Sequence, residues 1–296
     1  RKISPSLLLI PFSLIRSISQ VFRILHGADL LVGFGGYVSG PAYLAARIRR
    51  VPIVIHEANA RPGMANRLGS LFTEHNAVAY PVSNGKLSHA LLAGLPLRPD
   101  VDAAFHNAES DWEKARKDAK SRIGFSSAKP LIFIFGGSQG SVAINSVIDG
   151  ARARLGEAGL QILHSVGAKN HLPESDSSYK AVSYISDMAS AYLAADVIIS
   201  RSGAVSCSEI NTLGRYALFI PLPVGNGEQE LNANSLVSES RAEILEQKSF
   251  TSDWLVANIS RLLAESLKAP VAGSRKDIDA SSKMVALMEF AIAGGK

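Results

Sequence analysis

Residues 187–234 alternate helix and strand patterns in a way that restricts the fold of the whole chain. A helix pattern at 188–195 runs into a β-branched strand at 197–199, which ends in a Ser-Arg-Ser-Gly turn. A second helix pattern spans 204–214, and a second strand follows at 217–220. This alternation predicts a parallel sheet covered by helices. Because ligands of such sheets bind at the carboxyl ends of the strands, we expect a binding site at these turns.

The residues at these strand ends suit a phosphorylated, polyhydroxylated ligand. A Ser-Gly turn opens the second helix, and the amides of a helix start favour an anion. Glu209 lies on that helix, and a Gln-Glu-Leu-Asn run at 229–232 follows the next strand. These side chains can bind sugar hydroxyls.

Composition allows two globular domains. The chain has 296 residues, of which 47% are hydrophobic. The single cysteine, Cys207, excludes an intramolecular disulfide and fits a reducing cytoplasm. No uninterrupted apolar run is long enough to span a bilayer.

Positive charge is concentrated near the start of the sequence. Residues 1–61 hold eight Lys/Arg against Asp29 and Glu57, whereas the whole chain has a net charge of only +5. A local basic surface indicates an anionic partner such as a membrane, a pyrophosphate or a nucleic acid, although a solvated basic surface is the alternative.

Residues 11–25 predict a basic amphipathic helix. Its apolar stripe follows helical spacing: Leu14, Ile18, Val21, Phe22 and Leu25. The stripe alone fits a helix that packs on the sheet. Further apolar residues at 7–10, Phe12 and Ile15 exceed what one stripe needs. They predict an exposed apolar patch, which with Arg16 and Arg23 suits a membrane interface.

Two strand ends in the first part of the chain carry candidate groups. A strand at 29–34 ends in a glycine-rich loop, where backbone amides can approach a ligand. A strand at 51–55 is followed by His56, Glu57 and Asn59, a polar cluster that favours a site over a lone structural histidine. We expect helices at 41–50 and 62–71.

A second glycine loop, at 136–140, lies between a strand at 131–135 and a helix at 141–154. The order predicts a diphosphate cradle, with a tight structural turn as the alternative. The spacing is not the dinucleotide fingerprint, which disfavours a nicotinamide oxidoreductase. Further elements are predicted at the following residues: strands at 162–166 and 182–185, helices at 251–267 and 274–293.

We place the domain junction near residues 97–100. Two Asp-x-Asp triplets, at Asp100/Asp102 and Asp277/Asp279, resemble metal-binding pairs of sugar transferases. Neither follows a buried strand, so we interpret both as turn or helix-start residues and predict no metal site.

Five motifs in order resemble the bacterial MurG family, over nearly the whole chain. They are GFGGYVSGPAYLAA (33–46), HEANARPGMANR (56–67), FGGSQGSVAIN (135–145), YISDMASAYLAADVIISRSGAVSCSEI (184–210) and QELNA (229–233). The resemblance implies an α/β protein of the GT-B fold, with two Rossmann-like domains facing across a cleft. The expected divisions are an acceptor domain at 1–98, a UDP-GlcNAc domain at 99–273, and a terminal helix at 274–296 that packs back on the first domain.

The resemblance also implies the reaction. An inverting, metal-independent and cofactor-free transfer moves GlcNAc from UDP-GlcNAc to the MurNAc 4-hydroxyl of lipid I, giving lipid II for peptidoglycan. The expected partners are UDP-GlcNAc, lipid I and an anionic membrane surface, with no nucleic acid. The implied location is peripheral, on the cytoplasmic face of the plasma membrane.

Family positions assign roles to individual residues. Ser138 meets the diphosphate, Ile185 lies against uracil, and Gln229 reads the GlcNAc hydroxyls. The amides of Ala204, Val205 and Ser206 bind the phosphates, and Glu209 binds the ribose hydroxyls. Asn59 and Arg98 approach the donor from the first domain and the hinge.

Two departures from the family pattern concern the acceptor side. A Gly-Gly-Thr-Gly-Gly-His type loop that opens the family, with a histidine proposed for catalysis, is not among these residues, so we expect an N-terminally incomplete first domain. The usual His-Glu-Gln-Asn is His-Glu-Ala-Asn here, with Ala58 in place of a polar residue. Among the residues present, His56 and then Glu57 are the candidate bases.

Two alternatives stay open on the sequence. One is another GT-B enzyme, a different UDP-sugar transferase or a UDP-GlcNAc epimerase. The other is a non-catalytic, membrane-associated protein that binds a UDP-sugar.

Overall fold

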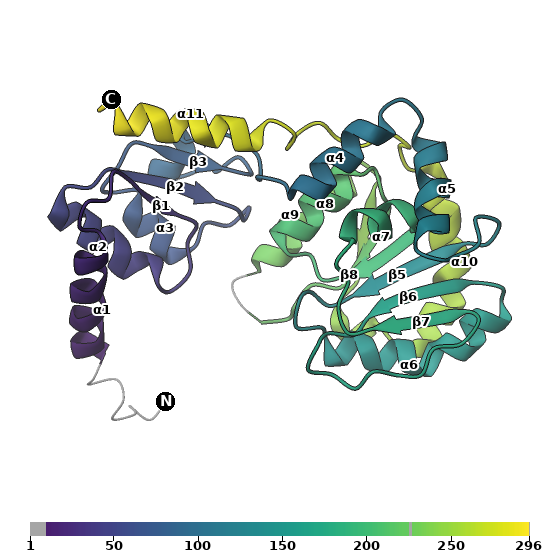
Figure 1. Cartoon of the computed structure of the whole chain (residues 1–296). Coiled ribbons are helices and arrows are strands. Elements are labelled where there is room, and N and C mark those ends of the chain that lie inside the picture. Colours follow the sequence, from purple (N-terminus) through teal and green to yellow (C-terminus); the bar gives the residue numbers. More distant parts are fainter. Residues whose placement is uncertain (1–9, 225–226, 296) are drawn as a thin grey trace. The chain divides into compact units, whose positions relative to one another are not determined.

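A computed structural model describes residues 10–224 and 227–295. The chain divides into two compact α/β units (Figure 1). Unit 1 takes in the described residues up to Pro96 together with those from Asp279, and unit 2 spans Leu97–Ile278. The predicted apolar residues Leu7, Leu8 and Leu9 lie outside the described residues.

Unit 1 is built on a four-stranded parallel sheet in the order β1-β2-β3-β4. Its strands are β1 (Leu31–Gly33), β2 (Ile53–Glu57), β3 (Asn76–Val78) and β4 (Leu91–Leu92). Its helices are α1 (Ile10–Ile24), α2 (Ser39–Arg49), α3 (Met64–Gly69), the short 3₁₀ helix Lys86–His89, and α11 (Ala280–Ile292). The carboxyl ends of β1, β2 and β3 therefore lie along one edge.

Helix α1 has one packed face and one exposed face. Of the predicted stripe, Ile18, Val21 and Phe22 pack on α2 and the sheet, as does Leu25 just after the helix, whereas Leu14 is exposed. Phe12 and Ile15 are exposed, at 73% and 65% of their surface. The predicted exposed apolar patch is therefore present on the described part of this helix. Over the part of the chain that the structure describes, no helix is long and apolar enough to cross a bilayer.

Helix α11 belongs to unit 1, although it follows all of unit 2 in the sequence. Met284 and Ala291 are buried against Val54, Ala77 and Ala93 of the sheet side. The helix begins after Asp279, which occupies the capping position. The sequence predicts a helix-start position for the second Asp-x-Asp triplet, although the Asp279 side chain makes no capping hydrogen bond.

Unit 2 holds a six-stranded parallel sheet in the order β10-β9-β8-β5-β6-β7. Its strands are β5 (Leu131–Phe135), β6 (Gln161–Ser165), β7 (Tyr179–Val182), β8 (Val197–Ser200), β9 (Ala217–Phe219) and β10 (Ala242–Ile244). Its helices are α4 (Pro99–Ala108), α5 (Trp112–Arg122), α6 (Val142–Glu157), α7 (Met188–Ala194), α8 (Ala204–Thr212), α9 (Glu228–Ser238) and α10 (Ser252–Lys268).

The strand order in unit 2 reverses between β5 and β8. Both strands are buried along their length and pair in register from Ile132↔Val197 to Phe135↔Ser200. At such a switch point the loops after the two strands separate, and ligands bind in the crevice between them. The sheet therefore directs a ligand to the glycine loop after β5 and the turn after β8.

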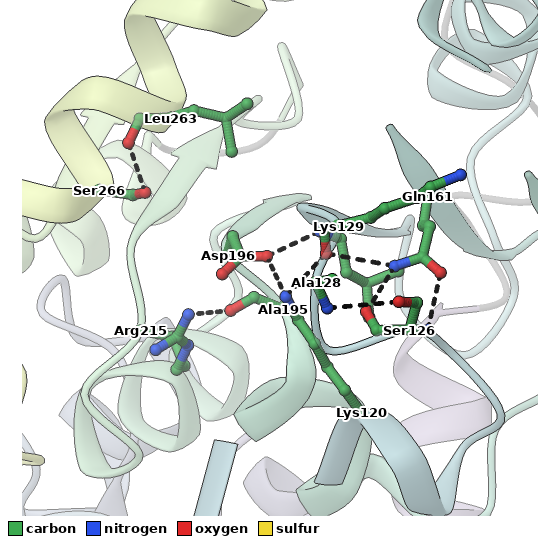
Figure 2. Close-up of polar contacts among 11 residues, drawn as sticks. Lys120, Ser126, Ala128, Lys129, Gln161, Ala195, Asp196, Arg215, Leu263 and Ser266 are labelled. Carbon is green, nitrogen blue, oxygen red and sulfur yellow. Dashed lines mark hydrogen bonds and ion pairs between the residues drawn. The ribbon is translucent and has the colours of Figure 1, made fainter. Parts of the chain in front are cut away.

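The opposite edge of this sheet is closed by a polar network (Figure 2). Asp196 Oδ2 accepts hydrogen bonds from Lys120 Nζ at 2.6 Å and from the Leu131 amide at 2.7 Å. The Gln161 side chain forms two hydrogen bonds with the Ser126 backbone: its Oε1 accepts from the Ser126 amide, and its Nε2 donates to the Ser126 carbonyl. These contacts provide hydrogen-bond partners for the chain at the starts of β5, β6 and β8.

The structure corrects three sequence-based assignments. The strand predicted at 182–185 is β7 at Tyr179–Val182, because Asp176 Oδ1 accepts from the amides of Ser178 and Tyr179 and starts the strand early. His56 and Glu57 lie within β2, not after it. Strand β10 was not predicted, since three residues at a sheet edge carry a weak pattern.

Candidate functional site

A cavity of about 340 Å³ lies at the carboxyl edge of the unit 2 sheet. Six of the residues predicted from the sequence line it: Arg98, Ser138, Ile185, Val205, Ser206 and Glu209. They come from the start of α4, the loop after β5, the loop after β7, and α8. The fold thus brings together groups that are as far apart as 111 positions in the sequence.

The strongest contact in this cavity joins Glu209 to Arg98. Arg98 Nε donates to Glu209 Oε1 at 2.7 Å, and Nη2 donates to Oε2 at 3.1 Å. The Glu209 side chain is almost fully buried. Burial raises the pKa of this carboxyl, and the Arg98 guanidinium opposes that rise. A bidentate pair of this kind fixes the carboxylate plane and leaves further lone pairs for a ligand.

Tyr192 on α7 is a second partner of Glu209 that the sequence analysis did not single out. Glu209 and Ser206 both act on the pKa of its hydroxyl, and the residue is 1% exposed. Burial raises the pKa of Tyr192 well above its ordinary value, and the nearby Glu209 adds to the rise. The phenol therefore stays protonated beside the carboxylate. The available signal was the one aromatic side chain in a helix of otherwise small and aliphatic residues.

The glycine loop after β5 needs glycine for steric reasons. Gly140 has φ +73°, and a Cβ there would lie 1.9 Å from the Val166 carbonyl oxygen. Asn170 Nδ2 donates to the Gln139 carbonyl at 2.9 Å and so holds the loop from outside. The loop leads into α6, where the side chain of Ser141 caps the helix by accepting from the Ile144 amide.

The start of α8 offers backbone amides to an anion. Gly203 precedes the helix in an extended conformation, and no side chain caps it. The amides of Ala204, Val205 and Ser206 are therefore those that the first turn of a helix leaves without intrahelical partners. Val205 and Ser206 line the cavity, and Ala204 is adjacent in the same turn.

Arg201 links the strand ends beside this turn. Its guanidinium donates to the carbonyls of Ile220 and Pro221, to Ser141 Oγ at 2.8 Å and to Gln247 Oε1 at 2.6 Å. Burial lowers the pKa of Arg201. Each of these acceptors is uncharged, so the contacts hold the cation at the carboxyl edge without neutralising it.

Gln229, at the start of α9, does not line this cavity. Its Oε1 accepts from the Leu222 amide at 3.0 Å. Asn232 in the same helix donates to the Ser202 carbonyl at 3.3 Å. These bonds tie α9 to the loops after β8 and β9.

The polar cluster of unit 1 surrounds Glu57. Glu57 Oε1 accepts from the Asn59 amide and side chain at 3.0 and 3.2 Å. Oε2 accepts from the Gly63 amide and from Asn66 Nδ2 at 3.0 and 2.9 Å. With four donors the carboxylate organises the turn after β2. His56 is 1% exposed, and its Nε2 donates to the Gly94 carbonyl at 2.8 Å.

Two family models match this chain. The glycosyltransferase family 28 N-terminal domain matches residues 1–78, and the glycosyltransferase family 28 C-terminal domain matches residues 131–288. The two parallel-sheet units and the site at the switch point are those of a GT-B glycosyltransferase of this family.

Curated relatives and solved structures narrow the class. The Streptomyces coelicolor UDP-N-acetylglucosamine–N-acetylmuramyl-(pentapeptide) pyrophosphoryl-undecaprenol N-acetylglucosamine transferase is 40% identical, over 94% of this chain and 78% of its own length. The enzyme of the same name from Saccharopolyspora erythraea is 38% identical, over 99% and 78%. The crystal structure of Acinetobacter baumannii MurG matches with a TM-score of 0.69 and 28% identity, over 94% and 79%. The chain belongs to this family of N-acetylglucosamine transferases.

Proposed function

We propose that this chain transfers GlcNAc from UDP-GlcNAc to the MurNAc 4-hydroxyl of lipid I, forming lipid II and UDP with inversion at the anomeric carbon. The observation that carries the proposal is the unit 2 cavity, in a chain of this family. The cavity places a buried carboxylate, a glycine loop and an uncapped helix start around one volume. A nucleoside diphosphate sugar offers the matching ribose hydroxyls and phosphates.

The donor is bound in unit 2 through groups of distinct chemistry. Ile185 packs on the uracil, and Glu209 accepts hydrogen bonds from the ribose hydroxyls. Ser138 and the amides of Ala204, Val205 and Ser206 hold the diphosphate. Gln229 on α9 binds the GlcNAc hydroxyls. To do so, its Oε1 gives up the hydrogen bond from the Leu222 amide and accepts one from the sugar.

Breaking the bond to the sugar leaves negative charge on the diphosphate of UDP. The start of α8 presents amides toward that charge, and the start of α6 adds a second helix dipole of the same sign. Arg201 contributes a cation fixed by four uncharged acceptors. These groups are set by the fold before reaction, so they stabilise the leaving group without rearranging.

The acceptor is placed at the carboxyl edge of the unit 1 sheet. Inversion requires a base that takes the proton of the attacking hydroxyl on the face opposite the leaving group. His56 is the candidate among the described residues, and Asn59 approaches the donor sugar. Because His56 Nε2 donates to Gly94, Nδ1 is the nitrogen that accepts in the neutral ring.

Helix α1 attaches the protein to the cytoplasmic face of the plasma membrane as a peripheral contact. Phe12 and Ile15 provide the exposed apolar surface, and Arg16 and Arg23 are exposed beside it. The Arg49 guanidinium of α2 lies 4.3 Å from the centre of the Phe22 ring and donates to the Phe22 carbonyl, so it packs on α1.

The test is transfer of labelled GlcNAc to a lipid I analogue, with UDP-GlcNAc binding measured in parallel. Transfer with β-linked product is the expected result. Binding without transfer would identify a UDP-sugar-binding protein instead. Absence of binding would remove the donor-site assignment, and with it the proposed activity.

A further inference from the structure

A second cavity, of about 630 Å³, lies in unit 1, and none of the residues that we assign to the donor lines it. Its walls come from the turn after β2, from α3 and from the segment after β3, including Ala60, Leu71 and Asn84. Volumes of this size are typical of sites for small organic ligands. The cavity is therefore large enough for several residues of a peptide.

Three cations line this cavity: Arg61, Arg67 and Lys86. Among the described residues that line it, none carries a carboxylate. Lys86 Nζ contacts Glu74 at 2.6 Å, but both side chains are exposed, at 48% and 74%. Such an exposed pair is weak, so a ligand carboxylate can compete for Lys86. The cavity has the charge of a site for an anionic ligand.

The position of the cavity relates it to the reacting sugar. The glycine loop follows β1, and the cavity is walled by the segments that follow β2 and β3, so the carboxyl end of β2, with Asn59, is next to both. A muramyl ring carries its pyrophosphate at one end and its peptide beside the 4-hydroxyl. A ring over the end of β2 can therefore extend the pyrophosphate toward the glycine loop and the peptide toward the cavity.

We propose that this unit 1 cavity binds the peptide of the acceptor, with Arg61, Arg67 and Lys86 pairing with its carboxylates. The inference rests on the proposed function, because it names the part of that acceptor which the cavity reads. Apolar wall residues such as Leu71 and Pro62 pack on the peptide side chains.

The experiment compares two acceptors in neutral detergent, using the full chain. One acceptor is a lipid-linked muramyl pentapeptide, and the other is the same compound with its peptide carboxylates amidated. For an Arg61→Gln/Arg67→Gln variant we expect KM for the carboxylate acceptor to rise on the order of tenfold. The kcat, the KM for UDP-GlcNAc and the KM for the amidated acceptor stay unchanged. Arg61→Lys/Arg67→Lys restores most of the affinity.

Lys283→Gln is the matched control, because Lys283 is an exposed cation of the same unit outside the cavity. Equal loss with both acceptors, or a wild-type chain that does not distinguish them, overturns the inference. A fall in binding to anionic vesicles without discrimination between acceptors identifies a lipid headgroup site instead. If the wild-type chain transfers GlcNAc to neither acceptor, the proposed function itself is refuted. The rate measured for the wild-type chain distinguishes this outcome from the others.

Discussion

Arg98 and Glu209 form a bidentate ion pair between the start of α4 and the middle of α8. The pair spans 111 positions of the sequence yet lies wholly within unit 2. One guanidinium therefore sets the orientation of the carboxylate that we assign to the ribose.

Replacing Glu209 with Gln should weaken UDP-GlcNAc binding. The amide keeps the volume but loses the charge that pairs with Arg98 and accepts from the ribose. Hydrogen bonds to charged groups contribute about 1.5–3 kcal/mol, which corresponds to a loss of affinity of roughly ten- to a hundredfold. Calorimetric titration with UDP-GlcNAc measures it. Glu157→Gln, at an exposed position at the end of α6, is the control, and equal affinity in both variants would contradict the assignment.

Removing the Tyr192 hydroxyl should lower donor affinity through Glu209 and not by direct contact. Tyr192→Phe removes the hydroxyl that interacts with Glu209 and Ser206, and we expect a loss of about 0.5–1.5 kcal/mol in binding. Tyr216→Phe removes a hydroxyl that donates to Glu243 elsewhere in unit 2. That control should affect the free energy of unfolding without changing the Kd for UDP-GlcNAc. If both variants bind equally well, Tyr192 has only a structural role.

Substitutions at two glycines should distinguish the cost of backbone strain from the cost of a steric clash. Gly140 and Gly159 both have positive φ, but only a Cβ at Gly140 meets another atom within 4 Å. Gly159→Ala should cost about 1 kcal/mol in unfolding free energy. Gly140→Ala should cost more and should also lower donor affinity, because the loop moves away from Val166. Denaturant unfolding and titration measure the two effects, and matching values for the two variants would argue against the clash.

The buried His164 should make the folded protein less stable in mild acid. Burial lowers its pKa to about 4, and it contacts Tyr179 and Asn145. Because the folded pKa lies below the unfolded value of about 6.5, the unfolded state binds the proton more readily. Stability is then present above pH 6.5 and decreases as pH falls toward 4. Between pH 7 and pH 5 the decrease should be about 2 kcal/mol.

The measurement compares denaturant unfolding of the wild type and a His164→Gln variant at pH 7 and pH 5. The variant should lose less stability over this interval. His171→Gln, at an exposed histidine of the same unit, should behave as the wild type. A pH dependence that is unchanged in His164→Gln would place the acid sensitivity elsewhere.

Charge removal at Arg16 and Arg23 should weaken membrane association. Each cation near an anionic surface contributes about 1 kcal/mol, so a double Gln variant should bind anionic vesicles roughly tenfold or more weakly. Sedimentation with vesicles of increasing anionic lipid content measures this. Lys283→Gln is the control for loss of a charge on another helix of unit 1. Unchanged binding in the double variant would exclude these two contacts.

Local patterns predicted the elements of unit 2 well where strands are long and buried. Strand β8 and helices α7 and α8 follow from their β-branched and apolar runs, and the glycine loop followed from its place between β5 and α6. The site was predicted through motif resemblance, and six of its residues meet in one cavity.

Contacts between residues far apart in the sequence could not be predicted from local patterns. The partnership of Tyr192 with Glu209 depends on how α7 and α8 pack, and neither residue's neighbours reveal it. The basic cavity of unit 1 arises because α3 and the segment after β3 bring Arg67 and Lys86 together, although the stretch after residue 81 has little local pattern. The start of β7 was displaced because a turn at Asp176 outweighs the β-branched run that follows.

The place of α11 has a consequence for biosynthesis. Unit 2 is one continuous stretch, so all of its strands leave the ribosome before the last helix of unit 1 is made. Until then Val54, Ala77 and Ala93 lack the cover that Met284 and Ala291 provide. Domains fold as units during synthesis, usually from the N-terminus onward. Here the order is reversed in part: the domain translated first is the one completed last.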